Sequence, residues 1–264
     1  MTLLHLGHDS VTDRLNLRTE VCALRVDPLG PVLRLINDRP GIFLHNDTAR
    51  YVQAFEFYAC SGERCLRNIS TGTRYHREVK PFLGARRRFS ARQLRLSREF
   101  AARAPFFRVD LFNLLIHSRI LLDRAVALSR RIFAGPRLPS FTSFAEHKKF
   151  FQNNPHVFSP RHQPYAQRLG NETAWFDMPL KAVRDKLAVH SGPSHIQFVT
   201  YPSEHDMGIF FVLDARRPWP EHPDASTVRV SARRLILDVK EFLTWYNAYL
   251  LGPLTEIAGP GCGN

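Results

Sequence analysis

The chain has 264 residues, 44% of them hydrophobic, which is enough to bury a sizeable core in one domain or one domain with an extension. No run of about 18 apolar residues occurs, so the sequence predicts no membrane-spanning helix. The formal net charge of +13 favours anionic partners, nucleic acid first. Because 31 basic residues are Arg and 6 are Lys, two explanations stay open: selection for phosphate contacts, or codon bias in a GC-rich genome.

The N-terminal residues lack the basic and apolar regions of a secretory signal, which favours a cytoplasmic protein without a membrane partner. The four cysteines have neither the spacing of a zinc finger nor the density of a disulfide framework: Cys22, Cys60, Cys65 and Cys262. Reduced thiols are therefore expected. No phosphate-binding glycine loop is present, and His190, His195 and His205 lack a close-spaced ligand pair, so we expect no cofactor and no metal.

Three regions are predicted along the chain. Residues 1–45 contain Asp-Pro, Gly-Pro and Arg-Pro-Gly breaks, which favour an irregular or partly β N-terminal extension. Residues 46–255 are predicted to form a helical domain with its core at 90–251, and 256–264 a flexible tail. The domain begins with a helix capped by Asp47 or Thr48, which Gly62 and Gly72 are expected to limit.

The clearest helical pattern covers residues 90–133, from a Ser90 cap across Pro105. Arg119 and Asp123 are spaced for a surface ion pair. The residues that repeat at the helical period, and are expected to face the core, are Leu111, Leu114, Leu115, Ser118, Leu122, Ala125 and Leu128.

Residues 142–152 predict a further helix, and 153–164 a loop. A helix over 179–190 follows, with Asp177 as its cap. The stretches "HIQFVTY" and "MGIFFVLD" predict a hairpin, and Ser231 caps a last helix. The apolar residues expected on one face of that helix are Leu235, Val239, Phe242, Leu243 and Tyr246. The predicted fold is mainly α: a helical bundle of about four main helices with a β-hairpin inserted before the last helix.

The densest basic run is "GARRRFSARQLRLSR" at 84–98. Its arginines suit a helix face that follows a phosphate backbone, and an ordinary solvated face is the alternative. The candidate nucleic-acid-binding residues are Arg86, Arg87, Arg88, Arg92 and Arg95.

Metal-free RNA cleavage needs a group that takes the 2′-hydroxyl proton and a cation that stabilises the phosphoryl group, tasks that suit His and Arg. Chance gives about four Arg/His pairs at a gap of four to six residues, and the sequence contains four. Three of these pairs, at Arg39, Arg216 and Arg217, cannot lie within a continuous helix, because proline follows each arginine closely, at Pro40, Pro218 and Pro220. Arg184/His190 alone lies on a predicted helix, with the polar Asp185 after the arginine.

In that setting "VRDKLAVH" resembles the signature of the HEPN superfamily, whose helical domains carry Arg, a polar residue and then His near the end of a late helix. The resemblance implies a metal-independent endoribonuclease that acts on RNA as a homodimer, with an antitoxin-like protein as a potential partner. It implies that Arg184 stabilises the phosphate, His190 acts as acid or base, and Asp185 orients one of them. Asp123 on the long helix is a looser candidate for a further polar partner.

Two other interpretations of this segment stay open. His190 continues an apolar face with Leu180, Val183 and Leu187, so it suits a core or C-terminal capping histidine. Many HEPN-like domains are also non-catalytic, which makes an RNA-binding or protein-interaction module the alternative to a nuclease.

Overall fold

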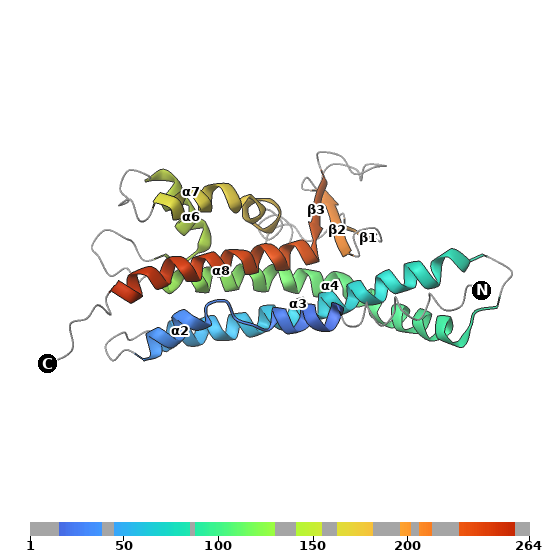
Figure 1. The fold of residues 1–264 in the computed structure, drawn as a ribbon. Helices are drawn as coiled ribbons and strands as arrows, with labels where there is room; N and C mark the ends of the chain where they lie inside the picture. The colour runs from blue at the N-terminus through green and yellow to red at the C-terminus, as the bar shows by residue number, and fades with distance from the viewer. Residues whose placement is uncertain are drawn as a thin grey trace. The chain divides into compact units, whose positions relative to one another are not determined.

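The described part of the protein is mainly helical in the computed structural model, with one small antiparallel sheet (Figure 1). None of the helices in this part is both long and apolar enough to cross a membrane. The residues that the structure describes are 16–38, 45–84, 88–129, 141–154, 163–181, 196–201, 206–212 and 227–256.

The chain divides into two compact units. Unit 1 comprises Met1–Val26, Ala59–Leu115 and Ala182–Ile236, and unit 2 comprises Asp27–Tyr58, Ile116–Lys181 and Leu237–Asn264. After a helical stretch at 16–24, the elements in chain order are α2 Gly30–Asn37, α3 His45–Glu78, the 3₁₀ turn η1 Lys80–Phe82, α4 Ala91–Ala127, α6 Phe144–Asn153, α7 Gln163–Glu172, the π-helical turn η3 Phe176–Lys181, β1 Ile196–Tyr201, β2 Asp206–Val212, β3 Thr227–Ser231 and α8 Ala232–Glu256.

The N-terminal region differs from the predicted irregular extension, because it contains the 16–24 helix and α2. Asp27 organises the start of α2: its Oδ1 accepts hydrogen bonds from the Leu29 amide at 2.9 Å and the Tyr51 hydroxyl at 2.7 Å. Pro31 lies in the first turn, where a missing amide hydrogen has no helical partner to lose. The Asp-Pro and Gly-Pro pairs therefore mark a helix start, and Val32 and Ile36 anchor α2 in the core.

Helix α3 runs through both glycines that were expected to limit it, so that prediction was wrong. At Gly62 the reason lies outside the helix. An added Cβ there would meet Leu24 Cδ2 at 2.7 Å, so the missing side chain lets Leu24, only 1% exposed, pack against the α3 backbone. The close approach compensates for the low helix propensity of glycine.

Within unit 1, the second part of α3 and the first part of α4 pack against each other. The predicted Ser90 cap is confirmed: Ser90 Oγ accepts from the Gln93 amide at 3.2 Å, and Gln93 Oε1 accepts from the Ser90 amide at 2.9 Å. Tyr75 of α3 stacks on Phe100 of α4, with ring centroids 3.9 Å apart. The residues predicted to face the core are also confirmed, since the six within α4 are buried and so is Leu128, directly after its end.

Asp110 is a buried polar residue at this packing surface and is only 3% exposed. It accepts a hydrogen bond from Asn68 Nδ2 at 2.7 Å and forms an ion pair with Arg64 Nε at 2.7 Å. The two α3 side chains thus offset the cost of burying the carboxylate.

In unit 2, α6 begins at Ser143, whose Oγ accepts from the Glu146 amide at 3.2 Å. Glu146 reaches back to the Thr142 amide and hydroxyl at 3.1 and 2.8 Å. Helix α7 begins at Gln163, inside a segment predicted as loop. Its Tyr165 and Leu169 are buried, so tertiary packing stabilises a helix whose composition is turn-like.

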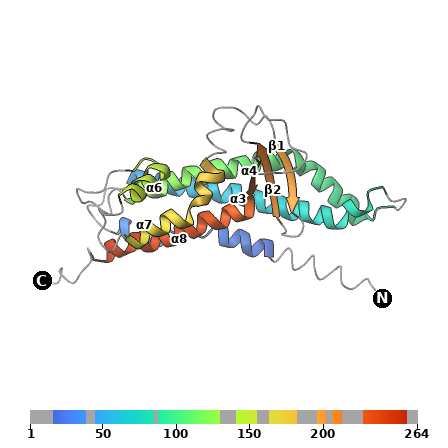
Figure 2. The same ribbon diagram turned by 90° about the horizontal axis from the view of Figure 1, so that it is seen from above.

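The strands form one antiparallel sheet in the order β1-β2-β3, and Figure 2 shows β1 alongside β2. Ile196 pairs with Phe211 and Tyr201 with Asp206, while Ile209 pairs with Val230. The third strand was not predicted. It leads directly into α8, where Ser231 Oγ accepts from the Arg234 amide at 3.1 Å, as the predicted cap requires. The predicted apolar face of α8 is buried throughout: Leu235, Val239, Phe242, Leu243 and Tyr246.

Candidate functional site

The segment that carries Arg184, Asp185 and His190 lies outside the described residues, so their predicted roles stay predictions. The chain immediately before it is described and is anchored in unit 2. Phe176 and Leu180 are fully buried, and the Phe176 ring packs on Phe144 with centroids 4.5 Å apart. The residues just before the Arg184 segment are therefore held in the core of unit 2.

Asp177, predicted as the cap of that helix, forms an ion pair with Lys148 instead. The Lys148 ammonium is almost buried and also donates to the Thr173 carbonyl at 3.1 Å. The carboxylate of Asp177 is thus used to neutralise a buried cation.

Asp123, the looser catalytic candidate, has a structural role in the described residues. Its Oδ1 accepts from the Phe144 amide at 2.7 Å, at the start of α6. Its Oδ2 lies 3.2 Å from Arg119 Nε, so the predicted ion pair exists. It is not a surface pair, however, because the Arg119 side chain is 7% exposed and lies over the Phe176 ring at 4.4 Å from its centroid.

The basic residues gather on the α3 and α4 segments of unit 1. Residues 59–115 hold thirteen Lys or Arg and four acidic residues, so this stretch carries +9 of the chain's +13 net charge. Among the predicted contacts, Arg86 and Arg87 lie outside the described residues, and Arg88, Arg92 and Arg95 are exposed. Arg92 forms an ion pair with Glu78 at 2.9 Å.

Arg95 has no ion-pair partner within the described residues, and neither does Arg98, which the sequence analysis did not select. The step of three residues from Arg92 to Arg95 and on to Arg98 confines the three side chains to an arc of about 120° on α4. This spacing could have identified Arg98 as a further candidate nucleic-acid-binding residue from the sequence. We call these three residues the α4 arginine face.

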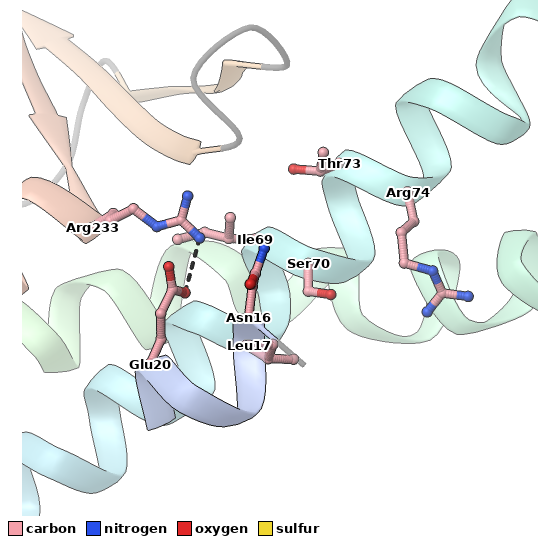
Figure 3. A pocket seen from close by; sticks show the side chains of 8 residues that line it. All are labelled: Asn16, Leu17, Glu20, Ile69, Ser70, Thr73, Arg74 and Arg233. Atoms are coloured by element: carbon pink, nitrogen blue, oxygen red, sulfur yellow. Dashed lines mark hydrogen bonds and ion pairs between the residues drawn. The ribbon is translucent and has the colours of Figure 1, made fainter. Parts of the chain in front are cut away.

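A separate cavity of about 210 Å³ lies in unit 1. Its lining comes from the 16–24 helix, α3 and α8: Asn16, Leu17, Glu20, Ile69, Ser70, Thr73, Arg74 and Arg233. Arg233 Nη2 donates to Glu20 Oε2 at 3.0 Å within this lining (Figure 3). Sequence reasoning missed this cavity because no local pattern connects three segments so far apart in the chain.

His147 is a strongly perturbed titratable group in the core of unit 2. It is fully buried in unit 2 against Phe141 and Phe151, at ring distances of 4.5 and 4.8 Å, and its Nε2 lies 2.6 Å from the Tyr165 hydroxyl. Burial lowers the pKa of His147 to about 3, so the imidazole is neutral in the folded protein. A neutral histidine enclosed by aromatic rings is part of the core rather than a catalytic group.

No group of three metal-ligating side chains occurs among the residues with described positions. Comparison with known proteins gave no matching family, no similar curated protein and no similar solved structure.

Proposed function

We propose that the chain is a HEPN-like protein that acts on RNA as a metal-independent endoribonuclease. The observation that carries the RNA part is the concentration of positive charge on residues 59–115, with the α4 arginine face exposed at its surface. Each arginine that neutralises a phosphate releases bound counterions, which makes such a surface suitable for nucleic acid of any sequence.

The helical architecture supports the same proposal. Helices α3, α4 and α8 contain 34, 37 and 25 residues, and the strands β1, β2 and β3 precede α8. We propose that these long helices, together with the helix predicted from the sequence around Arg184, form the bundle of about four main helices with a β insertion that the sequence predicts.

In the proposed reaction, His190 removes the 2′-hydroxyl proton, or returns a proton to the leaving 5′-oxygen, and Arg184 stabilises the charge that develops on phosphorus. Asp185 orients one of these two side chains. Six residues on one helix separate Arg184 and His190 by about 120° around the axis. A homodimer in which two such segments face each other brings an arginine and a histidine together, so the active form is a dimer.

The non-catalytic alternative also has an observation in its favour. The carboxylate of Asp123 is occupied by the Phe144 amide and Arg119, which leaves it a structural role. In this alternative the arginines of α4 bind RNA or an acidic protein partner, such as an antitoxin-like protein, without turnover.

The test compares wild type with His190→Ala and Arg184→Ala on a mixed RNA pool in the presence of a chelator. Cleavage that leaves cyclic-phosphate ends, and is lost in both variants while their folding is unchanged, supports the nuclease. A folded wild-type dimer that binds RNA without cleaving it supports the non-catalytic module instead. Activity that survives in either folded variant rejects the assignment of the pair.

A further inference from the structure

The cavity of unit 1 has a lining with an unusual balance of polar groups. The ion pair between Glu20 and Arg233 cancels one charge of each sign, and both side chains stay partly exposed, at 37% and 28%. The side chains of the uncharged polar residues Asn16, Ser70 and Thr73 make no hydrogen bond within the described part of the chain. The site thus offers hydrogen-bond donors and acceptors that have no protein partner in this part of the chain.

The orientation of these groups supports a binding role. Thr73 is only 8% exposed, and its hydroxyl is turned toward Arg233 (Figure 3). The apolar side chains of Leu17 and Ile69 line the same space. Arg74 and Arg233 stand on opposite sides of Asn16 in this view, so Arg74 supplies a second cation beyond the neutral Glu20/Arg233 pair.

These features restrict the chemistry of a ligand. A simple anion would face the Glu20 carboxylate, and a simple cation would face two guanidinium groups. A neutral planar ring with N–H groups beside carbonyl or ring nitrogen atoms satisfies both sides. Its N–H donates to Glu20, its acceptor atom receives from Arg233 or Thr73, and its faces pack on Leu17 and Ile69. Pockets for drug-sized ligands measure about 300–1,000 Å³, so a cavity of 210 Å³ suits one ring system.

We propose that this cavity binds a single nucleobase, with Arg74 beside the phosphate of the same nucleotide. The base comes from a free nucleotide or from single-stranded RNA, whose unstacked bases proteins recognise through their hydrogen-bonding edges. The RNA source rests on the proposed function and adds to it a place where one base of the substrate is recognised. Free nucleotide binding is independent of that function.

The test is titration calorimetry of the full chain with the four ribonucleoside 5′-monophosphates, and fluorescence anisotropy with short single-stranded RNA. Glu20→Gln removes the charge at constant size, and Thr73→Val removes the hydroxyl at constant shape. Glu63→Gln is the matched control, because it disrupts an Arg–Glu pair of unit 1 outside the cavity, with Arg25 and Arg67. Circular dichroism melting verifies that all variants fold.

We expect Glu20→Gln and Thr73→Val each to weaken binding of the preferred base about tenfold, while Glu63→Gln leaves it unchanged. Binding of the mononucleotide identifies a free nucleotide as ligand, and binding of RNA alone identifies the base of a strand. Equal affinity of the folded cavity variants and wild type overturns the inference, as does competition by inorganic phosphate that matches the nucleotide. No binding of any probe at millimolar concentration also overturns it. None of these results affects the cleavage test at His190, so the two proposals fail separately.

Discussion

Acidification is expected to destabilise the protein through His147. The folded-state pKa of about 3 lies below the ordinary value of 6.5, so the unfolded chain binds a proton in the interval between them and the folded protein does not. Stability from this residue is therefore present above pH 6.5 and is lost as the pH falls toward 3. The neighbouring phenols of Tyr165 and Tyr246 do not titrate in this interval, because burial raises the pKa of both.

The linkage relation gives about 2 kcal/mol of lost stability between pH 7.5 and pH 5 for this one group. The assay is urea unfolding at several pH values for wild type and for His147→Gln, which keeps a hydrogen-bonding partner for Tyr165 but does not titrate. The difference between the two proteins isolates His147, since all other groups titrate in both. A difference that stays constant from pH 7.5 to 5 would refute the burial of a neutral imidazole.

Three further outcomes are expected. Charge reversal at Arg95 and Arg98 should weaken single-stranded RNA binding and reduce the slope of log K against log salt by about 1.4. The control is Arg124→Glu, at an exposed site of α4 outside residues 59–115, and it should change RNA binding little. Equal effects of the two changes would count against RNA binding by the α4 arginine face. Gly62→Val should cost about 1–3 kcal/mol in urea unfolding because it collides with Leu24, and Leu24→Ala should restore part of that loss. Asp110→Ala should cost about 2 kcal/mol by leaving Asn68 without its acceptor, and a neutral result would mean that water replaces the carboxylate.

The parts of the fold that were predictable are governed by neighbours in sequence. Ser90 and Ser231 cap α4 and α8 because a side-chain oxygen three residues before an amide satisfies it locally. The helical spacing of apolar residues in α4 and α8 identified their buried faces, because this spacing is also a local property of the sequence.

The features that were wrongly predicted, or that no sequence pattern indicated, depend on contacts between residues distant in sequence. Gly62 continues α3 because Leu24 packs on it, and Asp110 is buried because Asn68 and Arg64 meet it from another helix. Arg119 is spaced as a surface ion pair yet lies over Phe176. At the candidate site, the positive charge of the basic run could be predicted from the amino-acid composition. The cavity at Glu20 and Arg233 could not, because its lining residues come together only in the folded structure.

The aromatic core around His147 also provides an optical reporter. Trp245 is 8% exposed and packs on Phe242 and Tyr165, with centroids 4.8 and 5.5 Å away, and Arg168 lies over its ring. An indole in such a dry setting emits at shorter wavelength than one in water. The difference in fluorescence between wild type and Trp245→Phe therefore reports the unfolding of unit 2 specifically. Comparison of that signal with far-ultraviolet ellipticity tells whether unit 1 unfolds in the same transition.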